Sequence, residues 1–196
     1  MFVNQIKARQ ISCFLILNQT TTDALVNLTS LNLNNNQITT IENLDALVNL
    51  TTLYLDNNQI TTIETLDSLV NLDTLFLSDN QLTTIENLDA LVNLTYLFLN
   101  NNQITTIENL DSLVNLTTLG LGYSQLTTIE NLDALVNLTN LYLDNNQLTT
   151  TEFNKLNSWA ILAPNNGTIY ASNNIDNFNL STTYTTLLAK GWTINT

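Results

Sequence analysis

Leucine and isoleucine recur along most of the chain with a period of 22 residues, from Leu25 until the register fails near Thr151. Six units follow one another, and counted from Leu28 as position 1 each reads LxxLxLxxNxIxxIxxLxxLxx. The spacing of Leu28, Leu31 and Leu33 predicts one short strand per unit. The chain is therefore expected to fold as an array of similar coils.

A single unit is too small to fold by itself. Its seven apolar positions contribute on the order of 10 to 20 kcal/mol when buried, whereas ordering its 22 backbone units costs about 1 to 2 kcal/mol each. Stacked units share their apolar faces and their strand hydrogen bonds. The repeat therefore predicts one elongated solenoid.

Both ends of the chain depart from the repeat, as expected where an array must hide its outermost coils. Residues 1–24 are a degenerate unit that is expected to cover the first coil, as either helix or strand, with the side chains of Phe2, Val3, Ile6 and Ile11. The six repeats are assigned to residues 25–156 and a C-terminal α/β cap to residues 157–196.

The C-terminal sequence predicts a mixture of helices and strands. Apolar spacing over residues 152–163 predicts one amphipathic helix that ends before Pro164. Residues 164–167 predict a turn, and 168–171 a further strand. Residues 181–190 predict a second helix with Gly191 as its C-cap, followed by a last strand over 192–194.

The pattern LxxLxLxxNxI resembles the leucine-rich repeat family, and the 22-residue unit is similar to the class found in bacterial internalins. The ending LLAKGWTINT resembles the C-terminal caps of bacterial and phage leucine-rich repeat proteins. The resemblance implies an α/β fold, a right-handed solenoid with a concave parallel sheet and a convex back of 3₁₀ or irregular turns. It also implies a buried asparagine ladder, made here of Asn36, Asn58, Asn80, Asn102 and Asn146.

Ser124 stands where that ladder calls for an asparagine. A serine hydroxyl replaces an amide that offers both donors and an acceptor. The fifth unit is therefore expected to be locally looser, or completed by water.

The six units differ mainly at positions 3, 5, 7 and 8, which the two-residue period of a strand directs away from the leucine core. Position 5 carries Tyr54, Phe76 and Phe98 in successive units, which predicts a contiguous exposed aromatic stripe. Such aromatic side chains on a rigid surface are typical binding anchors. The candidate partner-binding residues are Tyr54, Asp56, Phe76, Tyr96, Phe98, Gly120, Gly122, Tyr123, Tyr142 and Asp144.

Two alternatives stay open at these positions. In one alternative the aromatic side chains serve only to stack across strands, although a purely structural ladder gains nothing from Asn32 and Gly120 interrupting it. Gly120 and Gly122 strip the fifth strand of outward side chains beside Tyr123, which indicates either a pocket for a protruding ligand group or a tolerated defect. Asp56 and Asp144 favour a partner that carries Lys or Arg beside apolar groups.

The amino-acid composition excludes several classes of function and of site. The formal charge is −13, and all four basic residues lie outside residues 25–154, so the field repels nucleic acid and anionic membranes. The chain has no histidine and a single cysteine, Cys13, which removes imidazole triads, cysteine metal cages and intramolecular disulfides. No apolar run approaches the length of a membrane-spanning helix. Residues 11–17 follow Lys7 and Arg9 but lack a signal-peptide cleavage pattern, so they are interpreted as structure.

Regular polar columns complete the pattern. Glutamates at position 15 and aspartates at position 18 form two carboxylate ladders, which suit either calcium or, more simply, solvent and turn capping. Neither ladder contains one distinct acid beside one distinct base, so the sequence predicts no enzyme, cofactor or metal site. Thr-Thr pairs such as Thr39-Thr40 form hydroxyl columns similar to those of ice-binding solenoids.

The sequence thus predicts a non-enzymatic recognition module that binds a protein on its concave face, as an adhesin, effector or phage receptor-binding protein does. A glycan ligand or a homodimer through the same face are alternatives. A structural or ice-binding solenoid that uses its threonine or convex side, and an intracellular scaffold, are further alternatives. An extracellular, cell-surface or virion location suits the first interpretation, and a cytoplasmic one the last.

Overall fold

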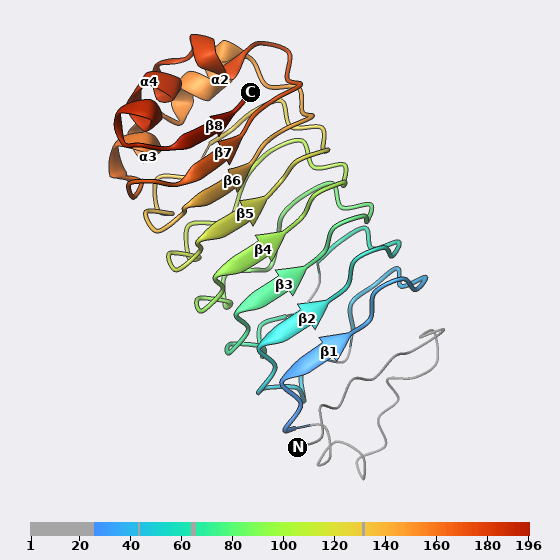
Figure 1. Ribbon diagram of the computed structural model, residues 1–196. Helices are drawn as coiled ribbons and strands as arrows, with labels where there is room; N and C mark the ends of the chain where they lie inside the picture. Colours follow the sequence, from blue (N-terminus) through green and yellow to red (C-terminus); the bar gives the residue numbers. More distant parts are fainter. Residues whose placement is uncertain (1–25, 43, 64–65, 131) are drawn as a thin grey trace.

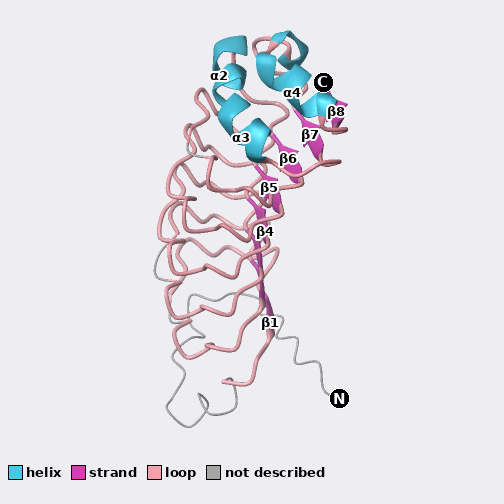
Figure 2. Ribbon diagram, turned by 90° about the vertical axis from the view of Figure 1, so that its left-hand side faces the viewer, coloured by secondary structure: helices cyan, strands magenta, loops and turns pink. Residues whose placement is uncertain are grey.

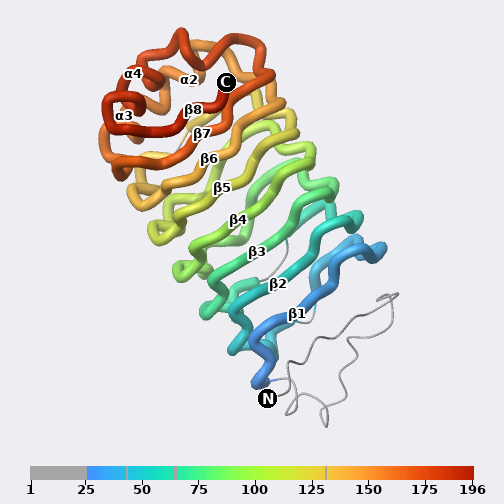
Figure 3. The backbone as a smooth tube through the Cα atoms, viewed as in Figure 1, coloured from blue at the N-terminus to red at the C-terminus, as the bar shows by residue number. Residues whose placement is uncertain are grey.

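The computed structural model describes residues 26–42, 44–63, 66–130 and 132–196. These residues form a solenoid whose coils stack side by side along one axis (Figure 3). The predicted N-terminal cap, residues 1–24, lies outside the described residues, and so does Glu64 of the predicted carboxylate ladder.

Each coil contributes one three-residue strand to a parallel sheet whose strand order follows the sequence (Figure 1). Strands pair with the equivalent residues one repeat later, so that Leu53 pairs with Leu31 on one side and Leu75 on the other. The repeat length therefore fixes the register. The strands are β1 (Ser30–Asn32), β2 (Thr52–Tyr54), β3 (Thr74–Phe76), β4 (Tyr96–Phe98), β5 (Thr118–Gly120), β6 (Asn140–Tyr142), β7 (Thr168–Tyr170) and β8 (Thr193–Asn195).

The strands lie along one side of the solenoid and loops form the opposite side (Figure 2). The apolar positions of the repeat form one continuous core. Leu53, Leu75 and Leu97, at the centres of three successive strands, are completely buried. On the back, the N–H of Leu47 donates to the carbonyl of Leu44 at 2.9 Å, and Leu50 donates to Leu47 at the same distance. These i to i+3 bonds explain the three-residue spacing of the apolar side chains in the turns.

The asparagine ladder is present and links the coils. The side-chain amide of Asn80 donates to the carbonyl of Leu77 in its own coil at 3.1 Å and to Leu55 of the preceding coil at 3.0 Å. Its Oδ1 accepts from the N–H of Ile60 at 3.0 Å. Asn174 in the C-terminal cap continues the ladder by donating to Leu143 at 3.0 Å. Each amide thus satisfies backbone groups that the coil itself leaves unpaired.

A second amide ladder runs along the loops that lead into the strands. Asparagines at position 22 donate from Nδ2 to the carbonyl of a valine in the preceding coil at 2.8 to 2.9 Å. The repeat displays these asparagines, but their role becomes visible only when coils are stacked. The residues are Asn49, Asn71, Asn93, Asn115 and Asn137.

Helices close the C-terminal end, and they are called the helical cap here although α2 lies within the range that the sequence assigns to the sixth repeat. They are α2 (Thr150–Lys155), α3 (Asn157–Leu162), the 3₁₀ helix η1 (Phe178–Leu180) and α4 (Thr182–Ala189). The single helix predicted over residues 152–163 is wrong, because the chain bends at Leu156 and forms α2 and α3 instead. The bend accompanies burial of two aromatic side chains. Phe153 packs edge-on against Phe178, and Trp159 Nε1 donates to the carbonyl of Leu135 at 3.1 Å.

The rest of the cap agrees closely with the sequence. The predicted helix over 181–190 is α4, whose N-cap Ser181 accepts from the N–H of Tyr184 at 3.1 Å. Gly191 follows it in the left-handed conformation at φ +77°, as expected for a C-cap glycine. The predicted last strand is β8, displaced by one residue.

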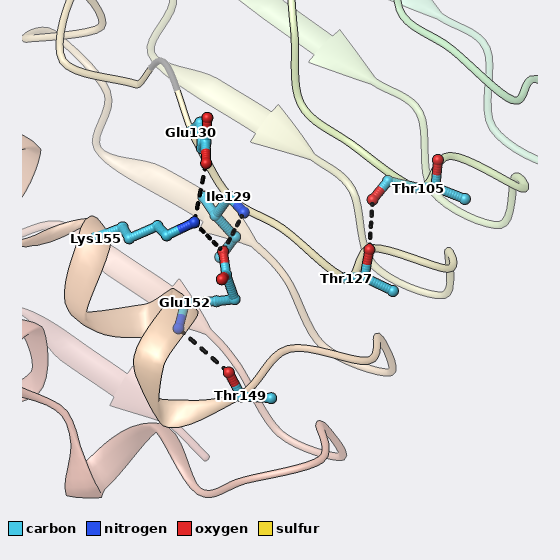
Figure 4. A network of polar contacts seen from close by, with 7 residues as sticks. All are labelled: Thr105, Thr127, Ile129, Glu130, Thr149, Glu152 and Lys155. Carbon is cyan, nitrogen blue, oxygen red and sulfur yellow. Dashed lines mark hydrogen bonds and ion pairs between the residues drawn. The ribbon is translucent and has the colours of Figure 1, made fainter.

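Polar contacts join this cap to the last repeats (Figure 4). Lys155 Nζ lies 2.9 Å from Glu130 Oε1 and 3.1 Å from Glu152 Oε2. The hydrogen bond to Glu130, and then that to Glu152, raises the pKa of Lys155. Glu152 also accepts a hydrogen bond from the N–H of Ile129 at 3.2 Å. Its carboxylate therefore contacts both Lys155 and the backbone of a neighbouring coil.

Candidate partner-binding face

The predicted aromatic stripe is a stack of parallel rings on the outer face of the sheet. Tyr54 and Phe76 are register partners whose ring centroids lie 4.8 Å apart with planes 5° from parallel. Phe76 and Phe98 lie 5.0 Å apart at 3°. Ring spacing thus matches strand spacing. Each stacked pair contributes about 0.5 to 1.5 kcal/mol, so stacking explains part of this pattern without any ligand.

A second stack lies on the far side of Gly120. Tyr142 on β6 and Tyr170 on β7 lie 4.6 Å apart with planes 6° from parallel. Tyr170 belongs to the cap and was not among the predicted site residues. The sequence predicts a strand at residues 168–171. The connection before β7 is longer than one repeat, however, so the sequence does not predict that Tyr170 pairs with Tyr142.

Gly120 and Gly122 do not leave an open floor between the two stacks. A Cβ atom on Gly120 would lie 2.6 Å from Asn100 Nδ2, and one on Gly122 would lie 2.7 Å from Asp144 Oδ1. The N–H of Gly122 also donates to Asn100 Oδ1 at 2.9 Å. The two glycines therefore leave space that the side chains of Asn100 and Asp144 occupy. Neither the predicted pocket nor the predicted tolerated defect describes this arrangement.

Two further tyrosines protrude beside the stacks. Tyr96 is 43% exposed and Tyr123 is 59% exposed. Neither ring contacts another aromatic ring among the described residues, so stacking accounts for neither.

Tyr123 also adopts a backbone conformation that its side chain disfavours. Its φ is +54°, in the left-handed region where a bulky residue is an outlier. Other coils place an asparagine or aspartate there, since these tolerate the left-handed region better. The equivalent residues are Asn35, Asn57, Asp79, Asn101, Asn145 and, in the cap, Asn173.

Carboxylates follow the stacks at the edge where the strands end. Asp56 Oδ1 accepts from the N–H of Ser78 at 2.9 Å, and Oδ2 accepts from Asn34 Nδ2 at 3.3 Å. Burial nevertheless raises the pKa of Asp56, with a smaller contribution from the charge of Asp79. Burial also raises the pKa of Tyr142, helped by Tyr170 and by the charge of Asp144. The face is thus aromatic at its centre and negatively charged along one edge.

The opposite side of the solenoid carries the remaining polar columns. Glu86, Glu108 and Glu130 are exposed, and Asp133 accepts from the hydroxyl of Ser158 at 2.7 Å. In the described ranges, no three His, Cys, Asp or Glu side chains are grouped closely enough to hold a metal ion. Among the helices of the described residues, none combines the length and apolar content needed to cross a bilayer.

Comparison with known proteins agrees with this architecture. A profile described as leucine-rich repeats in two copies matches residues 26–68 and again 70–112, and a single leucine-rich repeat profile matches residues 137–159. The chain belongs to the leucine-rich repeat family. Proteins of this family are generally non-enzymatic modules for protein interaction. No curated protein sequence matches this leucine-rich repeat chain.

Solved structures place the chain beside bacterial leucine-rich repeat proteins. An internalin of Listeria monocytogenes is 29% identical, with a TM-score of 0.74 over 91% of this chain and 50% of that one. A leucine-rich repeat protein of Leptospira interrogans is also 29% identical, with a TM-score of 0.75 over 90% of this chain and 44% of that one. This leucine-rich repeat chain therefore spans about half the length of these neighbours or less.

Proposed function

We propose that this leucine-rich repeat chain is a recognition module that binds a protein partner on the outer face of its sheet, the predicted concave face. The observation that carries the proposal is the exposed side chain and left-handed backbone of Tyr123. An exposed tyrosine in a left-handed conformation costs stability, and such outliers gather at functional sites. Its location beside the aromatic stacks and the acidic edge gives a mixed surface of the kind that protein interfaces use.

The stacked rings contribute differently from the two exposed tyrosines. Tyr54, Phe76 and Phe98 are half-buried, and their faces cover one another, so they form a rigid apolar floor. Tyr96 and Tyr123 extend beyond that floor and are the side chains a partner would bury most completely. Anchors of this type dominate interface energies when a partner excludes water from them.

The test uses substitutions that restore the residues of other coils. Tyr96→Thr copies Thr74, and Tyr123→Asn copies Asn101. Proteins captured on the immobilised chain are identified, and the affinity of each purified candidate is measured against both variants. We expect each variant to weaken binding at least about five-fold, a loss of roughly 1 kcal/mol or more.

Val70→Ala and Val92→Ala are the matched controls. These valines are 46% and 45% exposed and lie outside the strands, so they remove exposed apolar surface away from the tyrosines. The proposal fails if the valine variants weaken binding while the tyrosine variants leave it unchanged. That result would move the binding surface to the loops of the solenoid.

A further inference from the structure

In the asparagine ladder, the carbonyl oxygen that follows a strand is paired twice. Leu55 accepts from Asn58 Nδ2 at 2.9 Å and from Asn80 Nδ2 at 3.0 Å. Leu77 accepts from Asn80 Nδ2 at 3.1 Å and from Asn102 Nδ2 at 3.0 Å. A carbonyl oxygen has two lone pairs. Two ladder amides, one from its own coil and one from the next, therefore satisfy each of these carbonyls.

Ser124 removes one hydrogen-bond partner from each of three backbone groups. The carbonyl oxygens of Leu99 and Leu121 each accept from one ladder amide, at 2.9 Å, in place of two. The N–H of Ile104 has no acceptor among the described residues, whereas its equivalent Leu82 donates to a ladder oxygen at 2.9 Å. The Oγ atom of Ser124 is buried and also has no partner in the described chain.

These polar groups converge on one place, because their equivalents in an intact coil all contact a single side chain. In the third unit, the amide of Asn80 contacts the carbonyls of Leu55 and Leu77 and the N–H of Ile60. In the fifth unit, the corresponding groups surround the position of the amide that Ser124 lacks.

The coils keep their ordinary spacing at this position. The N–H of Gln125 donates to the carbonyl of Ile104 at 3.0 Å, and the equivalent bond from Gln81 to Ile60 is 2.9 Å. A serine side chain lacks the amide group of asparagine, so unchanged spacing leaves the place of that amide beside Oγ. Ser124 is also half-buried, whereas the ladder asparagines of the two flanking units are only 6 to 7% exposed. Solvent therefore reaches this place more easily than the flanking parts of the ladder.

We propose that one ordered water molecule binds beside Ser124 and completes the ladder. It accepts a hydrogen bond from the N–H of Ile104 and donates to the carbonyl oxygens of Leu99 and Leu121, and the Ser124 hydroxyl donates to it. A water molecule offers two donors and two acceptor lone pairs, so all four groups are paired. A metal cation does not suit this place, because the N–H of Ile104 presents its positive end there. The inference goes beyond the proposed function and does not depend on it.

The water lies next to a residue of the candidate partner-binding face. Tyr123, whose side chain is 59% exposed, directly precedes Ser124. In other units an asparagine side chain ties this turn covalently to the ladder. In the fifth unit an exchangeable molecule makes the connection, so the turn that presents Tyr123 is joined to the ladder through water.

NMR cross-relaxation between amide protons and water tests the inference in the wild-type chain. We expect the Ile104 amide to show a cross-peak with water whose sign marks a long-lived bound molecule rather than chemical exchange. Leu82 and Leu126 are matched controls, because they hold the same position in the flanking units and donate to ladder oxygens at 2.9 Å. A threonine follows all three residues, so a signal relayed through its hydroxyl would appear at all three. The control amides should show no cross-peak.

Two substitutions separate a bound water from the serine hydroxyl. Ser124→Asn places an amide in the ladder, displaces the water and should abolish the cross-peak. Ser124→Ala removes the hydroxyl but leaves the water three partners, so the cross-peak should persist. Thermal melting verifies that both variants fold. If Ser124→Ala does not fold, a crystal structure of the wild type decides, with density for one water within about 3 Å of the nitrogen of Ile104 and the oxygens of Leu99 and Leu121.

Several results would overturn the inference. They are the absence of the wild-type cross-peak, its loss in Ser124→Ala, its persistence in Ser124→Asn, and a crystal structure in which the place beside Oγ is dry. Exchange of the Ile104 amide with deuterium oxide much faster than that of Leu82 and Leu126 would also overturn it, in favour of a fifth unit that is locally looser.

Discussion

The side-chain amide of Asn146 donates a 2.9 Å hydrogen bond to the carbonyl oxygen of Leu121, one coil earlier in the solenoid. The coil before it has no such link, because Ser124 stands at the ladder position. Its Oγ is buried and has no hydrogen-bond partner among the described residues. The N–H of Ile104, whose counterpart Ile60 donates to the ladder, also lacks a partner in the described chain. The interruption of the ladder at Ser124 therefore leaves polar groups unpaired among the described residues, and a locally looser or water-completed fifth unit stays a prediction.

Replacing that serine should stabilise the protein. Ser124→Asn restores an acceptor for the N–H of Ile104 and a donor for the carbonyl oxygens of Leu99 and Leu121. Pairing buried polar groups contributes about 1 to 3 kcal/mol, so we expect the free energy of unfolding in urea to rise by that order. Asn80→Ser is the reverse control and should lower it by a similar amount. Unchanged or reduced stability of Ser124→Asn would contradict this account.

Tyr123→Asn should also stabilise the fold while weakening partner binding. Asparagine tolerates the left-handed backbone at φ +54°, and relief of such strain amounts to about 1 to 3 kcal/mol. Urea denaturation measures the gain. Asn101→Tyr is the matched control, because it introduces a tyrosine at the same position of the preceding unit and should destabilise by a comparable amount. If Tyr123→Asn instead destabilises the protein, the tyrosine ring contributes to folding rather than to binding.

Asp56 should make stability depend on pH with a definite sign. Its folded-state pKa is raised above the ordinary value of 3.8, chiefly by burial. The folded state therefore binds the proton more tightly than the unfolded state, and this contribution to stability is complete below the unfolded pKa. It is lost as pH rises through the folded pKa. The unfolding free energy of the wild type, relative to Asp56→Asn, should fall across that window.

A direct titration of the Asp56 carboxyl carbon by NMR provides the complementary measurement. Asp79→Asn removes a like charge that helps to raise the pKa of Asp56 and should lower that pKa. Asp133→Asn, on the back of the solenoid, is the control for a general change in net charge. A pKa for Asp56 at or below 3.8 in the wild type would contradict the role assigned to burial.

The sequence by itself determined the repeating architecture, because stacking coils of 22 residues buries the leucines that recur with that period. Once coils stack, each residue lies beside its equivalent in the next unit. Tyr54, Phe76 and Phe98 must then be neighbours, and Asn58 and Asn80 must form a ladder. Residues that are 22 positions apart in the sequence are therefore neighbours in the structure.

Only the tertiary structure determined the contacts at positions where the 22-residue period ends and the conformations of individual side chains. Tyr170 stacks on Tyr142 although 28 residues separate them, and Asn174 joins the ladder across a connection of irregular length. The bend at Leu156 depends on how the cap core packs around Trp159. Asn100 covers Gly120 because a neighbouring coil positions its amide there. Such contacts depend on packing between segments whose relative placement no local pattern specifies.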